Sequence, residues 1–499
     1  MDSKQFREAA ISSIDEIIKY YDTIEERRVV SNVEPGYLRK LLPSEAPQNG
    51  EAWADIQKDL ESKILPGITH WQSPNFLAWF PSSSSFPAML GEMYSTAFTG
   101  AAFNWICSPA VTELETIVLD WLAKAFDLPS CYLSTGPTNG GGVIHGTASE
   151  AIATVIVAAR DKYLREATAH ITDEEEREDA IAIRRSKLVA LGSASAHSAT
   201  KKGAQIAGVR FRVIPVYDTD DYRITGAELR RSIQELRAKG LEPFFLTATL
   251  GTTDTCAIDD MEGIASVLAE LAPEGPGEIW VHVDAAYAGA ALICPEYQHL
   301  AKPFERFHSF NMNLHKWLLV NFDCSAVWVR NRKHLTDALS VSLPILENQH
   351  TDSGLVTDYR DWQIPFGRRF RSLKVWFVIR TYGIEGLRAH IRDRIKYGKT
   401  FGELLGTRPD LFEIIAGPRF ALTVFKMAKR DSTPAGQNEF TKKVYNAIVE
   451  DGRIFLSSTM VGNVFAIRHN PAAVTVEERH VKKHFEIIVE VAEKTIASK

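Results

Sequence analysis

The sequence is poor in cysteine, has no excess of positive charge and lacks long apolar runs, and each shortage excludes a class of protein. Its five cysteines are scattered over 499 residues without CxxC spacing, which argues against a disulfide framework and against a zinc site. The formal net charge of −6 provides no basic surface for a nucleic acid. No uninterrupted apolar stretch is long enough to cross a bilayer, so a membrane partner is not expected either.

The N-terminus also lacks the continuous apolar core of a signal peptide. Its first residues, MDSKQFREAAISSIDEIIKYYDTI, carry charges throughout and predict an amphipathic helix with Phe6, Ile14, Ile17 and Ile18 on one side. We therefore expect a cytoplasmic protein. Residues 1–85 continue as helical stretches broken by prolines, which predicts an arm whose apolar face needs another surface to cover it, as in an interlocked oligomer.

The rest of the chain has the pattern of an α/β protein. Candidate strands at 186–193, 210–216, 243–251, 278–286 and 325–331 alternate with helical patterns such as 149–164 and 261–272. Strands that are apolar throughout and separated by helices indicate a mainly parallel sheet covered on both faces. After residue 361 shorter strands and helices follow. The predicted organisation is an arm (1–85), a large α/β domain (86–360) and a small C-terminal α/β domain (361–499).

Three features at the ends of these elements could carry chemistry. Asp284 is the last residue of an apolar strand. Lys316 lies in the apolar stretch 309–329, which has the pattern of a buried hairpin, and burial there would lower the pKa of its amine. NGGGVIHGTASEA (139–151) brings a glycine-rich turn to a helix start, a good phosphate cradle, although it is neither a Walker A loop nor GxGxxG. Singly, each has an ordinary interpretation: a turn residue, a surface lysine, a loop. Together they supply what pyridoxal 5′-phosphate requires, namely a Schiff-base lysine, a carboxylate for the pyridine nitrogen and an anion site.

Longer motifs strengthen this interpretation. They are SPAVTELE (108–115), GTASEA (146–151), TLGTT (249–253), HVDAAYAG (282–289), NLHKW (313–317) and DYRDWQIPFGRRFRSLKVWF (358–377). In these motifs, and over nearly its whole length, the chain resembles the group II pyridoxal-phosphate decarboxylases, most of all the aromatic-L-amino-acid decarboxylases. The resemblance implies the type I, aspartate aminotransferase-like fold and a homodimer with active sites at the subunit interface.

The resemblance implies roles for individual cofactor-site residues. Lys316 would bind the cofactor aldehyde, Asp284 would pair with the ring nitrogen, and His197 would stack on the ring. Without the motif, His197 would more readily be read as a buried core histidine. The other cofactor-binding positions are Thr147, Ala148, Ser149, Asn313 and His315 around the phosphate, and Thr253 and Ala286 near the ring.

The implied substrate pocket is rich in aromatic residues, which favours a flat apolar side chain through stacking and burial. For Trp79 and Phe103, packing in the core explains the residue nearly as well. Relatives that prefer histidine or small phenolic substrates often carry serine at the position of Gly367, so glycine leaves room for a larger ring and adds tryptophan to tyrosine, phenylalanine and DOPA. The implied wall consists of Trp71, Trp79, Phe80, Pro81, Ser82 and Phe103.

One position departs from the family pattern. The family's mobile catalytic loop corresponds to 339–355, and Ile345 stands where decarboxylating relatives carry a tyrosine that protonates the substrate Cα. Isoleucine cannot donate a proton. Another donor, with His350 or His197 as candidates, could complete the reaction and give an amine. Alternatively, O₂ could intercept the reaction and give an aldehyde, ammonia and hydrogen peroxide, unless the loop is simply misaligned here.

Three functions therefore remain open. The first is an aromatic amino acid decarboxylase that releases an amine and CO₂, and the second is an aromatic aldehyde synthase on the same scaffold. The third is a cofactor-binding protein whose catalysis has decayed and which is kept for an interaction. The presence of Lys316, Asp284 and His197 together weighs against the third.

Overall fold

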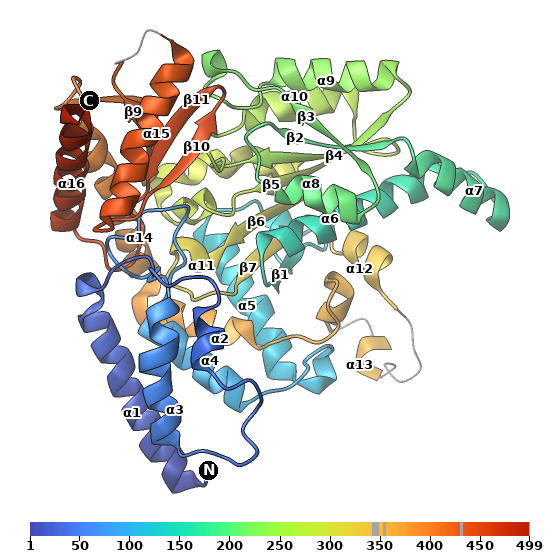
Figure 1. Ribbon diagram of the computed structural model, residues 1–499. Coiled ribbons are helices and arrows are strands. Elements are labelled where there is room, and N and C mark those ends of the chain that lie inside the picture. The colour runs from blue at the N-terminus through green and yellow to red at the C-terminus, as the bar shows by residue number, and fades with distance from the viewer. Residues whose placement is uncertain (342–348, 353–355, 430–432, 499) are drawn as a thin grey trace.

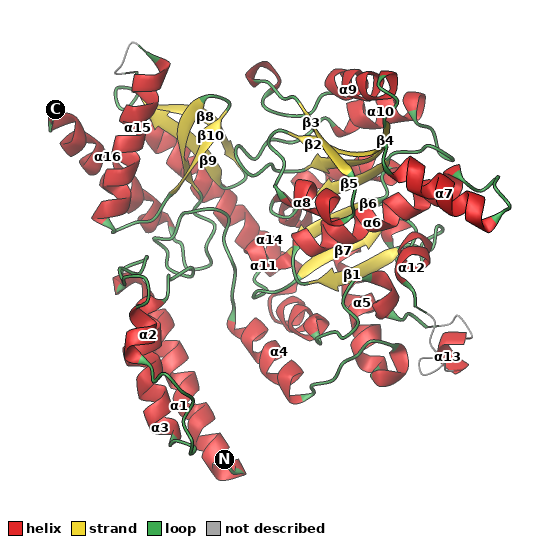
Figure 2. Cartoon of the chain, turned by 45° about the vertical axis from the view of Figure 1, so that its right-hand side comes forward, coloured by secondary structure: helices red, strands yellow, loops and turns green. Residues whose placement is uncertain are grey.

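The computed structural model describes residues 1–341, 349–352, 356–429 and 433–498. An N-terminal arm projects from the rest of the molecule, as Figure 2 shows, and Figure 1 gives the order of its helices. Phe6, Ile14, Ile17 and Ile18 are all exposed on its first helix, so the expected apolar face is uncovered in the single chain. The arm contains α1 (Ser3–Asp22), α2 (Tyr37–Leu41) and α3 (Trp53–Asp59).

A seven-stranded sheet forms the centre of the chain, in the order β1-β7-β6-β5-β4-β2-β3. The pairs β2–β3, β2–β4, β4–β5 and β5–β6 are parallel, whereas β7 runs antiparallel to both of its neighbours. This mainly parallel sheet confirms the predicted fold class. Its strands are β1 (Gly141–His145), β2 (Leu188–Ser193), β3 (Arg210–Ile214), β4 (Glu242–Thr249), β5 (Trp280–Asp284), β6 (Ser309–Asn313) and β7 (Ser325–Val329).

Helices cover both faces of this sheet, as the continuous apolar strands predict. Alternate residues of β2 belong to different core clusters: Val189 and Leu191 pack on one face, and Leu188 and Ala190 on the other. The helices of this region are α4 (Phe86–Ala97), α5 (Pro109–Ala125), α6 (Ala148–Ala167), α7 (Glu174–Arg185), α8 (Ala199–Ile206), α9 (Gly226–Ala238), α10 (Met261–Leu271), α11 (Leu314–Trp317), α12 (Lys333–Leu339) and α13 (Gln349–Asp352).

The glycine-rich stretch before α6 corrects one expectation, because β1 is a buried strand and not a turn. Its glycines are explained by crowding. A Cβ added to Gly142 would lie 2.9 Å from Leu119 Cδ1 and 3.0 Å from Trp328 Nε1. Only glycine lets the strand approach these side chains so closely.

The C-terminal part forms a second, antiparallel sheet of four strands in the order β10-β11-β9-β8 (Figure 2). The long helix α14 (Arg371–Gly406) leads to it and is kinked at Gly383, whose φ is 64°. Among the described residues, no helix has the length and apolar character to cross a membrane. The elements of this part are β8 (Phe412–Arg419), β9 (Leu422–Met427), α15 (Pro434–Asp451), β10 (Ser457–Val461), β11 (Val464–His469) and α16 (Glu478–Ala497).

Candidate active site

Several strands of the large sheet end at the same edge, and this edge carries the predicted site residues. In the sheet register Thr249 of β4 pairs with Asp284 of β5, and Asp284 pairs with Asn311 of β6. Through β7, Asn313 at the end of β6 shares a row with His145, the last residue of β1. Ligands of α/β sheets bind at this end of the strands. The register therefore brings β1, β4, β5 and β6 to one candidate site.

Asp284 is a buried carboxylate at this edge. Its Oδ1 accepts a hydrogen bond of 3.0 Å from the Ala286 N–H, which fixes the side chain. On the same strand, His282 is held between the Ser309 hydroxyl at 2.8 Å and the Asn311 amide oxygen at 2.9 Å. Burial lowers the pKa of His282 to about 4, so this imidazole is neutral at pH 7. The negative charge of Asp284 is therefore available to a cationic ligand atom.

Lys316 lies in α11, just beyond β6, with its amine inside the protein. The amine nitrogen is 4.9 Å from the centre of the Phe80 ring. Burial lowers the pKa of Lys316 to about 8; the Asp284 and Cys256 side chains oppose this shift, and the Arg468 guanidinium adds to it. At pH 7 about a tenth of the amine is therefore uncharged, compared with less than about a thousandth for an ordinary lysine, and the uncharged form is the nucleophile.

The backbone that carries Lys316 is fixed by the segment after the arm. The Ser83 N–H donates to the His315 carbonyl at 2.7 Å, and the Ser83 hydroxyl donates to the Lys316 carbonyl at 2.7 Å. Pro81 just before it is buried, and Ser82 is half-buried. The segment that contains Phe80, Pro81 and Ser82, which are predicted substrate-pocket residues, therefore also fixes the backbone of Lys316.

The glycine-rich stretch leads to the N-terminus of α6, where an anion site is predicted. Thr147 is the N-cap, and its hydroxyl accepts from the Glu150 N–H at 3.3 Å. The N–H groups of Ala148 and Ser149 have no acceptor within the helix and lie at its positive end. This 20-residue helix thus offers backbone donors and a favourable dipole to a phosphate.

Two further predicted phosphate-site residues, Asn313 and His315, lie at the end of β6 and in α11. Asn313 is buried, and its side-chain oxygen has no hydrogen-bond donor among the described groups. His315 Nδ1 accepts from the Cys324 N–H at 2.9 Å, which leaves its ring hydrogen on Nε2. Burial, with the charges of Lys316 and Lys374, lowers the pKa of His315 to about 3. His315 is therefore a neutral donor.

Aromatic rings form a wall beside Lys316. Phe80 stacks on Tyr287 with ring centres 3.9 Å apart, and Tyr287 stacks on Trp317 at 4.5 Å. Trp71 and Trp79 stack on each other at 5.3 Å, and Trp79 is 49% exposed. The exposure of Trp79 makes core packing a poor explanation for this residue and leaves its ring available to a ligand.

The segment that holds Trp79 is also bonded to the C-terminal sheet. The Leu77 N–H donates to the Phe455 carbonyl at 2.8 Å, and the Trp79 N–H donates to the Ser457 hydroxyl at 3.0 Å. The Asn470 side chain donates to the Trp79 carbonyl at 3.3 Å. Trp79 has a φ of 50°, an uncommon conformation for a non-glycine residue, and its two backbone bonds hold it there.

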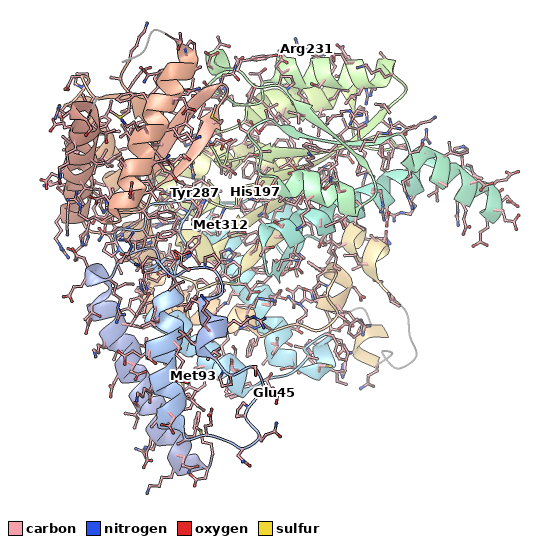
Figure 3. All side chains as sticks on the ribbon, viewed as in Figure 1. Glu45, Met93, His197, Arg231, Tyr287 and Met312 are labelled. Carbon is pink, nitrogen blue, oxygen red and sulfur yellow. The ribbon has the colours of Figure 1, made fainter. Side chains whose placement is uncertain are left out.

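His197 lies in the loop between β2 and α8, near the middle of the molecule (Figure 3). Its imidazole is exposed, and Nδ1 accepts from the Ala199 N–H at 3.1 Å. The interpretation as a buried core histidine is therefore wrong. Thr253 is half-buried in the loop that follows β4, and Ala286 is half-buried directly after β5.

Phe103, Gly367 and His350 lie in a different group of contacts from Lys316. The Phe103 ring packs on Phe366 at 4.9 Å, and Gly367 next to it is exposed. His350 packs on Trp105 with ring centres 4.7 Å apart. Within the single chain, the sequence-predicted residues therefore form two groups, a larger one around Lys316 and a smaller one around Phe103.

Comparison with known proteins identifies the chemistry of this arrangement. The family described as "Pyridoxal-dependent decarboxylase conserved domain" matches residues 35–428, most of the chain. The chain belongs to this family. This confirms the resemblance, the enzyme class and pyridoxal phosphate as cofactor.

The similarity of individual relatives to this decarboxylase extends over whole chains. Phenylacetaldehyde synthase of Arabidopsis thaliana is 43% identical and covers 99% of this chain and 96% of its own. Aromatic-L-amino-acid decarboxylase of Rattus norvegicus is also 43% identical, covering 99% and 98%. The crystal structure of Oryza sativa TDC with PLP and tryptamine matches with a TM-score of 0.92, 36% identity and 99% coverage of each chain.

The residues of the site fit the cofactor of these decarboxylases. The first turn of α6 offers donors to a phosphate, Lys316 offers an aldehyde an amine whose pKa is lowered to about 8, and Asp284 offers a negative charge to a protonated ring nitrogen. The donor set therefore matches the group.

The lowered pKa of Lys316 gives a testable pH dependence for this decarboxylase. Only the neutral amine attacks an aldehyde, so we expect the rate of cofactor capture by the cofactor-free enzyme to rise about tenfold per pH unit and to level off above about pH 8. Stopped-flow absorbance would measure this rate, with N-acetyl-lysine in solution as the control for titration of the cofactor itself. A rise that continues to the ordinary lysine value of 10.5 would contradict the effect of burial.

Two residues at this decarboxylase site had no role in the sequence interpretation. Tyr287 lies within a quoted motif, and only its stacking between Phe80 and Trp317 shows what it does. Arg468 comes from β11 of the C-terminal sheet, and its guanidinium lies 5.1 Å from the centre of the Phe80 ring. An arginine in the apolar pattern VFAIRH was the available signal.

Proposed function

We propose that the enzyme decarboxylates an aromatic L-amino acid and releases the aromatic amine and CO₂, with tryptophan, tyrosine, DOPA and phenylalanine as candidate substrates. The observation that carries the proposal is the amine of Lys316 beside the Phe80–Tyr287–Trp317 stack, at the sheet edge where Asp284 lies. Phe80 and Trp79 are the accessible rings here and would bind a flat apolar ring through stacking and buried area, whereas Tyr287 and Trp317 are buried and support Phe80. The relatives named for aromatic amino acid decarboxylation support the proposal.

We assign the binding of the cofactor to residues of the sheet edge. Thr147, Ala148, Ser149, Asn313 and His315 would hold the phosphate, and His197, Thr253 and Ala286 would lie against the ring. When bound, pyridoxal phosphate accepts the electron pair that is left on the substrate Cα as CO₂ departs. The part played by Asp284 is to keep the ring nitrogen protonated through its negative charge, and Ala286 N–H holds that carboxylate in place.

The aromatic pocket would be completed by a second copy of the chain. We propose a homodimer in which Phe103, Gly367 and His350 of one subunit face Lys316 of the other. Exposed apolar side chains on two helices support this, because such surfaces in a soluble protein usually lie at interfaces. These side chains are Phe6, Ile11, Ile14, Ile17 and Ile18 on α1 and Phe86, Leu90, Met93 and Tyr94 on α4. On this proposal residues 1–85 serve dimerisation, 86–360 bind the cofactor and 361–499 form the small domain.

A second function, aromatic aldehyde synthesis, is favoured by one residue. Ile345, which lies outside the described residues, stands where the resemblance places a proton-donating tyrosine. Without a donor, the substrate carbon could instead be oxidised: amino acid, O₂ and water would give aldehyde, CO₂, ammonia and hydrogen peroxide. Phenylacetaldehyde synthase is among the similar relatives. His197 and His350 are candidate proton donors, and the retained His197 favours the amine, because some aldehyde-forming relatives replace that histidine.

A product assay distinguishes the two functions. We expect CO₂ and amine in equal amounts, with hydrogen peroxide below about a tenth of the CO₂, for at least one of the four candidate amino acids. The Ile345→Tyr enzyme should shift any aldehyde product toward amine, because a phenol can donate a proton. Peroxide equal to CO₂ in the parent enzyme would replace the proposal by the aldehyde synthase, and Ile345→Phe serves as the control for ring size.

A further inference from the structure

Glu115 of α5 and Arg368 form a buried ion pair beside β1. Glu115 Oε1 and Arg368 Nη2 are 2.6 Å apart, and the two side chains are 0% and 1% exposed. Both charges have lost their water, so a pair of this kind contributes little net stability, yet removal of one partner leaves the other charge buried and uncompensated. The backbone groups that the pair holds are therefore more informative than its contribution to stability.

The pair takes the place of a neighbouring strand at the free edge of β1. In the described sheet β1 is an edge strand, bonded to β7 on one side. On the other side the Ile144 N–H donates to Glu115 Oε1 at 2.8 Å, and Arg368 Nη2 donates to the Ile144 carbonyl at 3.2 Å. One ion pair thus satisfies both outward-facing backbone groups of Ile144. Three residues later Thr147 caps α6, so the pair fixes the strand that leads to the predicted phosphate site.

The same arginine also fixes the segment 364–367, which contains Gly367 of the implied substrate pocket. Arg368 Nε donates to the Gln363 amide oxygen at 3.0 Å, so the residues on the two sides of this segment are bonded to each other. The Arg368 backbone N–H donates to the Ala101 carbonyl at 2.6 Å. Two residues further on is Phe103, whose ring packs on Phe366 of this segment. Arg368 therefore holds together the group of residues around Phe103.

We infer that Glu115 and Arg368 are positioning residues for two parts of the active sites, the phosphate end of β1 and the pocket wall at Phe103 and Gly367. This rests on the proposed function, in which that wall faces Lys316 of the partner subunit. One buried contact in each subunit then acts on its own site through β1 and on the partner subunit's site through the wall. Both residues act through others and are not catalytic.

Glu115 offers a disruptive and a conservative variant at one position. Both of its bonds go to Oε1, and Oε2 has no donor among the described residues. Glu115→Gln can therefore keep both bonds, whereas Glu115→Leu keeps the approximate size and removes the acceptor. We expect Glu115→Leu to raise the Kd of the cofactor-free enzyme for pyridoxal phosphate about tenfold or more, as measured by absorbance titration. The ratio of kcat/KM for two aromatic substrates of different ring size should change about fivefold or more. Glu115→Gln should keep both quantities within about threefold of the parent.

Arg368→Lys is the second variant, and it tests the pair even where Glu115→Leu does not fold. Lysine keeps the charge beside Glu115 and loses the fork that also reaches Gln363. We therefore expect the substrate ratio to change about fivefold and the Kd for pyridoxal phosphate to stay within about threefold. An unchanged substrate ratio would contradict the role of Arg368 in the wall.

The control for loss of a buried ion pair is Glu278→Leu. Glu278 is paired with Lys162 at 3.0 Å and lies before the start of β5, at the opposite end of that strand from Asp284. Its loss should lower thermal stability and leave the Kd for pyridoxal phosphate and the substrate ratio unchanged. A Glu115→Leu enzyme that resembles this control in all three measurements would overturn the inference and leave the pair with a purely structural role.

Mixed dimers separate the two effects. Chains with different affinity tags, produced together, give dimers in which one subunit carries Lys316→Ala, so the visible absorbance and the turnover report on the site of the other subunit. Glu115→Leu in the subunit that keeps Lys316 should weaken cofactor binding, and Glu115→Leu in the Lys316→Ala subunit should change the substrate ratio. Both effects arising from the same subunit would overturn the assignment to two sites. A parent enzyme that turns over none of the four candidate amino acids would contradict the proposed function instead, and the titration with pyridoxal phosphate would still test the pair.

Discussion

The Lys316→Ala enzyme should convert an aromatic amino acid at least ~1,000-fold more slowly than the parent, the scale seen when a covalent catalytic group is removed. It should also lose pyridoxal phosphate on gel filtration and with it the visible absorbance of the holoenzyme. The physical reason is that the amine of Lys316, with its pKa lowered to about 8 by burial, is the nucleophile for the cofactor aldehyde.

A matched control for this change is Lys162→Ala. Lys162 is also buried, but it lies on α6 in an ion pair with Glu166 and Glu278, each at 3.0 Å. Its loss should lower thermal stability and leave the visible absorbance unchanged. Turnover by the Lys316→Ala enzyme at the parental rate would remove the basis of the proposed function.

The Asp284→Asn enzyme should keep its fold and lose about 10²–10³-fold in kcat, as expected when a charge aimed at the reacting group is removed. Asparagine can still accept from the Ala286 N–H, so the position of the side chain is preserved and the negative charge alone is lost. The protonated ring nitrogen then has no anionic partner. Steady-state kinetics at saturating cofactor would measure the loss.

Asp260→Asn provides the comparison for this second change. Asp260 is the N-cap of α10 and accepts from the Gly263 N–H at 3.0 Å, a role that asparagine fills equally well. Its kcat should stay within about twofold of the parent. An Asp284→Asn enzyme that is equally active would mean that the ring nitrogen does not depend on this carboxylate.

Much of the large sheet could be predicted because its strands are apolar on both faces. The expected strands at 186–193, 243–251 and 278–286 correspond to β2, β4 and β5, with ends displaced by one or a few residues. β1 could not be predicted, because glycines in a strand are explained only by the distant side chains that crowd them. β6 and β7 form the antiparallel pair expected from the interpretation of 309–329 as a buried hairpin. SFNMN was nevertheless absent from the candidate strands because it carries asparagines, and the His282 ring that is hydrogen-bonded to Asn311 is apparent only in the folded chain.

Individual residues of the site could be predicted only where they lie within motifs that resemble those of the family. The sheet register brings Asp284, Asn313 and the start of α6 to one edge, and Lys316 follows within one turn. The roles assigned to individual residues remain predictions, which variants such as Lys316→Ala and Asp284→Asn would test. Arg468 was not found, because a single arginine in a C-terminal strand gives no sign of a partner more than a hundred residues away.

Trp79 is held on both sides of its peptide by the C-terminal sheet, through Ser457 and Asn470, while Ser83 a few residues later is bonded to the turn of Lys316. Substitution of Ser457 or Asn470 during evolution would change the orientation of the Trp79 indole and leave the side chains that face the bound molecule unchanged. Enzymes of this kind could thus exchange one ring for another through mutations that a survey confined to pocket-lining positions would overlook.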